Sequence, residues 1–235
     1  IYNLFAFFVL CPALIMLAVS SRNDFNETDL HIRATLAQDQ QRVSHQLENW
    51  IRSRKTPILN LAEMAASRSP QQMQTYLEMA RKSDGNYLRV GLLNKAATTT
   101  AYFPLLDELG QSNIGKNYID RPFLPTLTQS LKPVLSEVVM GRIGTPAPIV
   151  QLVAPVLIGG EYAGFVTGIL SMDQIREHLD ASFKQTDTLF TLLDRNGNVI
   201  TTNRADQTVM SPFVRAQGTL RQLDSEVSQW VPIAS

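Results

Sequence analysis

Two apolar segments joined by a pair of glycines do most to limit the fold of this chain. The segments span residues 149–157 and 162–171, and Gly159 and Gly160 lie between them. Both segments are rich in β-branched and aromatic residues, which favour strands. A two-glycine loop is typical of a tight hairpin. The pattern therefore predicts two adjacent antiparallel strands that are apolar enough to be buried in a sheet.

Patterns on either side of this hairpin predict an antiparallel α+β domain over about residues 86–180. The period of the apolar residues changes from helical to alternating near Asn86. Helices are expected at residues 22–61, from Ser69 and Pro70 to about 83, within 118–130 and at 173–180. Strands are expected at residues 87–93, 98–103, 134–142, 149–157, 162–171, 188–193 and 198–202. The last two form a further hairpin, which begins a second unit.

The first 21 residues contain no charged side chain, and residues 4–19 form an apolar run. A helix that spans a membrane needs about 20 apolar residues. We therefore expect a transmembrane helix at residues 1–21. A secretory signal peptide with a cleavage site at Ala18–Ser20 is an alternative reading of the same residues, and a buried core helix is a third.

A thin apolar stripe predicts a long helix after this segment. Leu36, Val43 and Trp50 recur every seven residues, and Leu47 and Ile51 widen the stripe. The stripe is expected to pack the helix against another element, and a homodimer interface is a second possible use of it.

Pro57 lies near the end of this helix. Because proline lacks a backbone N–H, it is expected to kink or interrupt the helix there.

Composition argues against several classes of function. Lysine and arginine together number 21, as do aspartate and glutamate, so no global positive field attracts nucleic acid. Cys11 is the only cysteine, which excludes an intrachain disulfide and a cysteine-based metal site. The three histidines have no metal-binding spacing, and no nucleophile motif is present. We expect no catalytic residue, no metal and no cofactor.

Two further segments come close to known motifs without matching them. Residues 110–117, GQSNIGKN, resemble a phosphate-binding loop, but Asn117 replaces its final Ser or Thr. Residues 194–205 begin like a calcium loop, but Val199 takes the place of the required glycine and Ala205 that of the glutamate. Nucleotide and calcium binding are both rejected.

Residues 115–123, GKNYIDRPF, resemble the signature of extracytoplasmic Cache sensor domains. Residues 132–136, 148–150, 154–156 and 164–170 are similar to the strands that follow in that family. Residues 194–200, DRNGNVI, resemble the opening hairpin of the second module in double Cache domains. This resemblance implies a PAS-like sensor, periplasmic or extracellular, usually flanked by two membrane helices.

The resemblance also implies a domain organisation. Residues 1–21 would be the transmembrane helix, and residues 22–85 the long helix with a second helix. Residues 86–180 would be the membrane-distal PAS-like module, and residues 181–235 part of a membrane-proximal module. The fold class is thus α+β, with a long N-terminal helix, a PAS-like antiparallel sheet and the start of a second such module.

Arg121 is the leading candidate for ligand contact, because a guanidinium can hold a carboxylate through two parallel hydrogen bonds. The corresponding arginine anchors the ligand carboxylate in amino-acid-binding relatives. The alternative is a structural pair with Asp120 or Glu137. Asp120, which belongs to the same motif, is also a candidate for the site.

Asp173 is the second candidate, since an aspartate there accepts the ligand ammonium in those relatives. Its alternative role, not exclusive of the first, is the N-cap of the helix that follows. Tyr118 and Phe123 either line the pocket or belong to the core. In the relatives an arginine precedes a Trp-Tyr pair, whereas Pro122, Phe123 and Leu124 follow Arg121. A depleted aromatic cage makes a small carboxylate a candidate ligand beside an amino acid.

The leading hypothesis is the extracytoplasmic ligand-sensing region of a membrane-anchored receptor, most simply a sensor histidine kinase in the cell membrane. A diguanylate cyclase or a chemoreceptor is an alternative output. A membrane-tethered enzyme and a ligand-free assembly module are hypotheses from other classes. The expected partners are a small molecule, the membrane and a second copy of the chain.

Overall fold

The computed structural model describes residues 32, 34–35, 38, 41–183, 189–215, 217–222 and 228–232. Residues 1–21, where a transmembrane helix was expected, lie outside this set, as does Leu36. Within the set, no helix is both long and apolar enough to cross a membrane. The chain divides into two compact units, Ile1–Gln46 with Leu220–Trp230, and Leu47–Thr219 with Val231–Ser235. The second unit holds the sheet.

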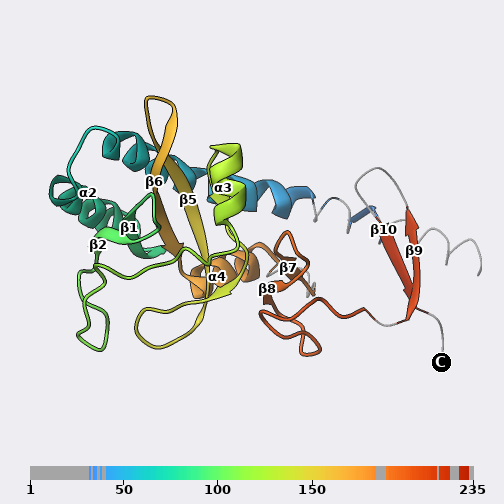
Figure 1. The fold of residues 1–235 in the computed structure, drawn as a ribbon. Coiled ribbons are helices and arrows are strands. Elements are labelled where there is room, and N and C mark those ends of the chain that lie inside the picture. Colours follow the sequence, from blue (N-terminus) through green and yellow to red (C-terminus); the bar gives the residue numbers. More distant parts are fainter. Residues whose placement is uncertain are drawn as a thin grey trace, which may run out of the picture. The chain divides into compact units, whose positions relative to one another are not determined.

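An antiparallel sheet forms the centre of the larger unit (Figure 1). Its strands lie in the order β2-β1-β6-β5-β3, and β4 also pairs with β5. They are β1 (Tyr87–Asn94), β2 (Thr99–Phe103), β3 (Val134–Leu135), β4 (Val139–Met140), β5 (Pro148–Ile158) and β6 (Glu161–Leu170). The expected hairpin is present as β5 and β6. Gly159 and Gly160 both have positive φ, at 61° and 86°, as a type I′ turn requires.

The single strand expected at residues 134–142 is two short strands, β3 and β4. Ser136 separates them because its side chain joins the hydrogen bonding. The Gln151 N–H donates to Ser136 Oγ at 2.9 Å, and Ser136 Oγ donates to the Glu137 carbonyl at 2.8 Å. A side chain that replaces a backbone partner ends regular pairing at this point.

Helices lie before, within and after the sheet in sequence. One helix spans residues 41–65, and the others are α2 (Pro70–Ser83), α3 (Leu124–Ser130) and α4 (Met172–Phe183). The expected start of α2 is confirmed, because Ser69 and Gln72 form a capping box. The first helix is not interrupted at Pro57. One turn earlier, the Arg54 carbonyl accepts a hydrogen bond from the Tyr87 hydroxyl.

Alternation along the strands divides the sheet into two faces. Gly168 lies on the face covered by the first helix, where a Cβ would be 2.6 Å from Ile58 Cδ1. Gly91 lies on the opposite face, where a Cβ would be 2.3 Å from the Tyr102 ring. The ladder between β1 and β6 is irregular between Tyr87 and Arg89. This bulge lets Tyr87 reach the first helix while Arg89 faces the other way.

The apolar stripe of the first helix packs within the chain. Leu47, Trp50 and Ile51 border a small gap whose other walls are Leu135, Val150, Leu170, Ile175, Leu192 and Ile200. Trp50 also stacks on His178 of α4, with ring centroids 5.7 Å apart. This packing agrees with the expectation that the stripe holds the helix against another element.

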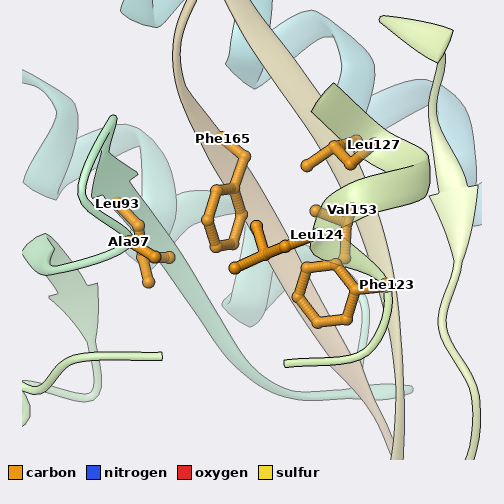
Figure 2. Close-up of a cluster of buried hydrophobic side chains, with 7 residues drawn as sticks. All are labelled: Leu93, Ala97, Phe123, Leu124, Leu127, Val153 and Phe165. Atoms are coloured by element: carbon orange, nitrogen blue, oxygen red, sulfur yellow. The ribbon is translucent and has the colours of Figure 1, made fainter. Parts of the chain in front are cut away.

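The helix α3 covers part of the opposite face (Figure 2). Its residues Leu124 and Leu127, with Phe123 before it, contact Phe165 of β6 and Val153 of β5. Leu93 and Ala97 complete this buried cluster. The cluster fixes the position of the loop that precedes α3.

A second hairpin follows α4, formed by β7 (Thr191–Leu193) and β8 (Val199–Thr202), and a third sheet pairs β9 (Gly218–Gln222) with β10 (Ser228–Pro232). The turn of the second hairpin holds the segment between β3 and β4. Arg195 Nε is 3.1 Å from the Glu137 carboxylate, and Arg195 Nη2 donates to the Leu135 carbonyl at 2.6 Å. The Val138 N–H donates to Asp194 Oδ2 at 3.2 Å.

We predict that Gly168→Ala lowers stability by about 1–3 kcal/mol, because the new methyl group overlaps Ile58 and Tyr87. Gly85→Ala is the matched control, since a Cβ there meets no atom within 4 Å. Urea denaturation of both variants measures the difference. Equal stability of the two variants would contradict the packing of the first helix on this face.

We predict that Arg195→Met destabilises the protein by about 1–3 kcal/mol, because it leaves a buried carboxylate without its partner. The Glu137 side chain is only 7 % exposed. Adding Glu137→Gln to the same chain should recover most of the loss. Arg204→Met, which breaks an exposed pair with Asp206, serves as the control in the same denaturation series. A loss no larger than that of Arg204→Met would show that the pair of Arg195 with Glu137 contributes little to stability.

Candidate ligand-binding site

A small cavity lies on the face of the sheet opposite the first helix. Its volume is about 20 Å³. The sheet provides the floor, and the loops before α3 and after β4 provide the walls. The lining residues are Arg89, Leu93, Tyr102, Tyr118, Arg121, Phe123, Gly141, Arg142, Ile143, Ile149, Gln151, Phe165, Thr167 and Ile169.

Arg121 is a buried cation that forms no ion pair with a carboxylate of the described residues. Its residue is 6 % exposed, and it lies in the turn just before α3. Nη1 donates to the Met140 carbonyl at 3.0 Å, but Nε has no hydrogen-bond partner. Burial, followed by the charge of Arg142, lowers the pKa of Arg121. A buried charge with so little compensation is costly to the fold.

The two structural partners considered for Arg121 are both engaged elsewhere. Asp120 forms a bidentate ion pair with Arg142, in which Arg142 Nη1 is 2.9 Å from Asp120 Oδ1. Glu137 pairs with Arg195. Among the residues that the structure describes, no aspartate or glutamate forms an ion pair with Arg121. The structural alternative for this residue therefore lacks a partner.

Two more arginines line the cavity, and each forms an ion pair with an acidic side chain. Arg89 pairs with Glu108, and Arg142 pairs with Asp120. The hydrogen bond from Arg142 lowers the pKa of Asp120. Since these two pairs are neutral as units, the unpaired guanidinium of Arg121 leaves the cavity with a net charge of +1.

The two aromatic candidates both line the cavity, in different ways. Tyr118 is half-buried, its ring centroid is 5.6 Å from the Arg121 guanidinium, and its hydroxyl has no hydrogen-bond partner. Burial raises the pKa of Tyr118, so the hydroxyl stays protonated and can donate. Phe123 is also part of the core, because it packs edge-to-face on Phe165 with centroids 5.8 Å apart.

Asp173 does not lie at this cavity. It is exposed in the first turn of α4 and borders an open groove of about 760 Å³, which shares Arg89, Gly141, Ile143 and Ile149 with the cavity. It is not the cap of α4 either. Ser171 takes that role, because its Oγ accepts from the Gln174 N–H at 3.3 Å. The structure therefore brings together Arg121, Tyr118 and Phe123, with Asp120 at the rim, and leaves Asp173 outside.

Several lining residues were missed by the sequence analysis. Gln151 and Thr167 lie on neighbouring strands and form a buried hydrogen bond of 2.9 Å beneath the cavity. Arg89 projects to the same face from β1. Their signal in the sequence is a polar side chain in the interior of each of three largely apolar strands. Arg142 carries no such signal, since it lies in a loop.

The loop that resembles a phosphate-binding motif has a structural explanation. Lys116 Nζ lies 3.2 Å from Asp107 Oδ2. Asp107 also accepts from the backbone N–H groups of Leu109, Gln111 and Gly144. These hydrogen bonds lower the pKa of Asp107, and the one from the Gln111 N–H has the largest effect. No group of three or more metal-binding side chains occurs in the described part of the chain.

Comparison with protein-family models found no match, and comparison with curated proteins found none either. Solved structures do match. The ligand-binding domain of the Pseudomonas aeruginosa amino acid chemoreceptor PctB, in complex with L-Arg, gives a TM-score of 0.62 at 22 % identity. The match covers 75 % of this chain and 67 % of that one.

Two further structures support the same comparison. The ligand-binding domain of the Pseudomonas fluorescens chemoreceptor CtaA, in complex with L-isoleucine, gives a TM-score of 0.58 at 19 % identity and covers 72 % of this chain and 67 % of its own. An extracellular ligand-binding receptor from Desulfohalobium retbaense gives a TM-score of 0.63 at 16 % identity. This match covers 73 % of the present chain and 31 % of the receptor chain. The chain thus spans about a third of that receptor.

These matches, with TM-scores of 0.58 to 0.63, show that the chain shares the fold of these structures. The resemblance that the sequence indicated is therefore confirmed at the level of the fold. This chain has the α+β, PAS-like fold of the Cache-type sensor domains.

Proposed function

We propose that this chain is the extracytoplasmic ligand-sensing region of a membrane-anchored signalling receptor, and that it binds a small molecule with a carboxylate in the cavity beside Arg121. The observation that carries this proposal is the buried guanidinium without an acidic partner. A fold that tolerates such a charge gains stability when an anion enters and pairs with it.

The geometry around Arg121 supports a carboxylate as the anion. Nε is free, and the Tyr118 hydroxyl nearby is a second buried group without a partner. A carboxylate has two oxygens, so it can accept hydrogen bonds from a guanidinium and from a hydroxyl at once. Arg121 Nη1 donates to the Met140 carbonyl in the free protein. A bound carboxylate would either replace this carbonyl as the acceptor or accept from Arg121 alongside it.

The comparisons support sensing as the role of this pocket. PctB and CtaA are chemoreceptors whose structures hold amino acids. Their likeness favours a chemoreceptor output as much as the sensor histidine kinase expected from the sequence. Within this proposal, residues 1–21 anchor the chain in the cell membrane, and residues 86–180 form the membrane-distal sensing module. Residues 181–235 begin the membrane-proximal module, and the long helix pairs with a second copy.

We predict two opposite effects for Arg121→Met. Without ligand, the variant should be as stable as the parent or more stable by about 1–4 kcal/mol, because an unpaired buried charge is removed. With ligand, the variant should lose the stabilisation that the parent shows. A ligand at 100 times its dissociation constant stabilises the parent by about 2.7 kcal/mol. Thermal unfolding of the 235-residue chain in a mild detergent, against a panel of carboxylates, amino acids and amines, measures both.

Arg204→Met is the matched control for this experiment. It removes an arginine whose partner, Asp206, is exposed, and which does not line the cavity. This control should keep the response to ligand. If Arg121→Met instead destabilises the unliganded protein strongly and keeps the ligand response, Arg121 is a structural residue and the proposed site is wrong.

A further inference from the structure

We propose that the ion pair between Arg89 and Glu108 is a gate, which closes the cavity beside Arg121 off from the open groove next to it. The gate deepens the proposed function, on which it rests, because it supplies the route by which a carboxylate reaches Arg121. Three features support it: the size of the cavity, the wall that the cavity shares with the groove, and the glycine that makes room for Glu108.

The cavity is too small, with the gate closed, to hold a carboxylate beside Arg121. Its volume of about 20 Å³ is enough for little more than a water molecule, which needs roughly 10–15 Å³. The groove is far larger, with a volume of about 760 Å³, which is in the range of sites for small molecules, roughly 300–1,000 Å³. A ligand that reaches Arg121 therefore needs an opening between the two spaces.

The cavity and the groove meet at a common wall. The residues that line both are Arg89, Gly141, Ile143 and Ile149. Gly141 has no side chain, and the two isoleucines are buried in a core cluster with Tyr102. Arg89 is therefore the shared residue whose side chain can move without disturbing the core.

Glu108 holds the Arg89 side chain in this wall. Arg89 Nη2 donates a hydrogen bond to Glu108 Oε1. The Arg89 side chain is only 12 % exposed, whereas that of Glu108 is 62 % exposed. Because the Glu108 carboxylate is well hydrated, it can exchange the guanidinium for water at little cost in free energy. A carboxylate that enters from the groove can also take its place on Arg89, since the two groups have the same hydrogen-bonding geometry.

Gly144 leaves free the space that Glu108 occupies. Its φ of 66° lies in the left-handed region, and a Cβ there would be 1.8 Å from Glu108 Oε2. The Gly144 N–H also donates to Asp107 Oδ2 at 3.3 Å, which ties the loop after β4 to the residue before Glu108. A side chain at position 144 would therefore push Glu108 away from Arg89 without removing either charge.

Chemical labelling of a cysteine in the cavity tests the gate without any ligand. Thr167→Cys places a thiol in the lining of the cavity but not of the groove, in a chain whose only cysteine is replaced by Cys11→Ser. Thr145→Cys, which is exposed in the groove, is the reference. The 235-residue chain in a mild detergent reacts with iodoacetamide, which is uncharged, and mass spectrometry gives the rate. Ile169→Cys, also in the cavity lining, repeats the measurement at a second position.

Two variants open the gate in different ways, and each has a matched control. Glu108→Gln removes the charge of the acid, and Asp206→Asn does the same at an exposed ion pair elsewhere. Gly144→Ala keeps both charges but takes the space of Glu108. Gly159→Ala introduces a similar backbone strain, at a φ of 61°, where a Cβ meets no atom within 4 Å.

We expect the cavity thiol to react more slowly than the groove thiol. Both gate variants should accelerate its reaction by about two- to fivefold, as the loss of an ion pair with an exposed partner implies. The two controls should leave the rate unchanged.

Equal rates in the cavity and the groove would overturn the gate, as would acceleration by only one gate variant or by neither. An acceleration that Gly159→Ala or Asp206→Asn shares would overturn it as well. Carboxylate binding has its own test in the thermal unfolding described above, so the gate and the proposed function can fail separately.

Discussion

Antiparallel pairing of β6 with both β1 and β5 is the constraint on which the other features of the larger unit depend. Because side chains alternate across these three strands, one face receives the first helix and the other receives the cavity. Gly168 and Gly91 mark the two faces, since each lies where a neighbouring side chain needs the space of a Cβ. A shift of one residue in the register would exchange the faces and destroy both the core and the site.

The site combines this rigid floor with loops that carry the charges. Gln151, Thr167 and Arg89 come from strands, whereas Arg121 and Arg142 come from the loops around α3 and β4. Arg121 holds the carbonyl of Met140, and the segment before Met140 is held in turn by Arg195 and Asp194. The anion site and the second hairpin are thus connected through one short segment of chain, residues 135–140.

Local patterns were sufficient to predict much of the fold. The hairpin of β5 and β6, the start of α2 and the short helix after Arg121 each follow from neighbouring residues and are found where expected. Three features depend on contacts between distant segments and were not predicted. The Ser136 side chain divides one strand into two, Ser171 caps α4 in place of Asp173, and the partners of Arg89 and Arg142 come from other loops.

The state of the Arg121 guanidinium is the central claim of this account, and nitrogen NMR of the arginine side chains tests it directly. The Nε–H resonance of Arg121, assigned with Arg121→Met, should indicate a group without a hydrogen-bond partner in the free protein. Addition of a small carboxylate that stabilises the protein should shift this resonance and leave that of Arg204 unchanged. An Arg121 resonance that already indicates a carboxylate partner in the free protein, or that does not move with any small carboxylate, would contradict the account.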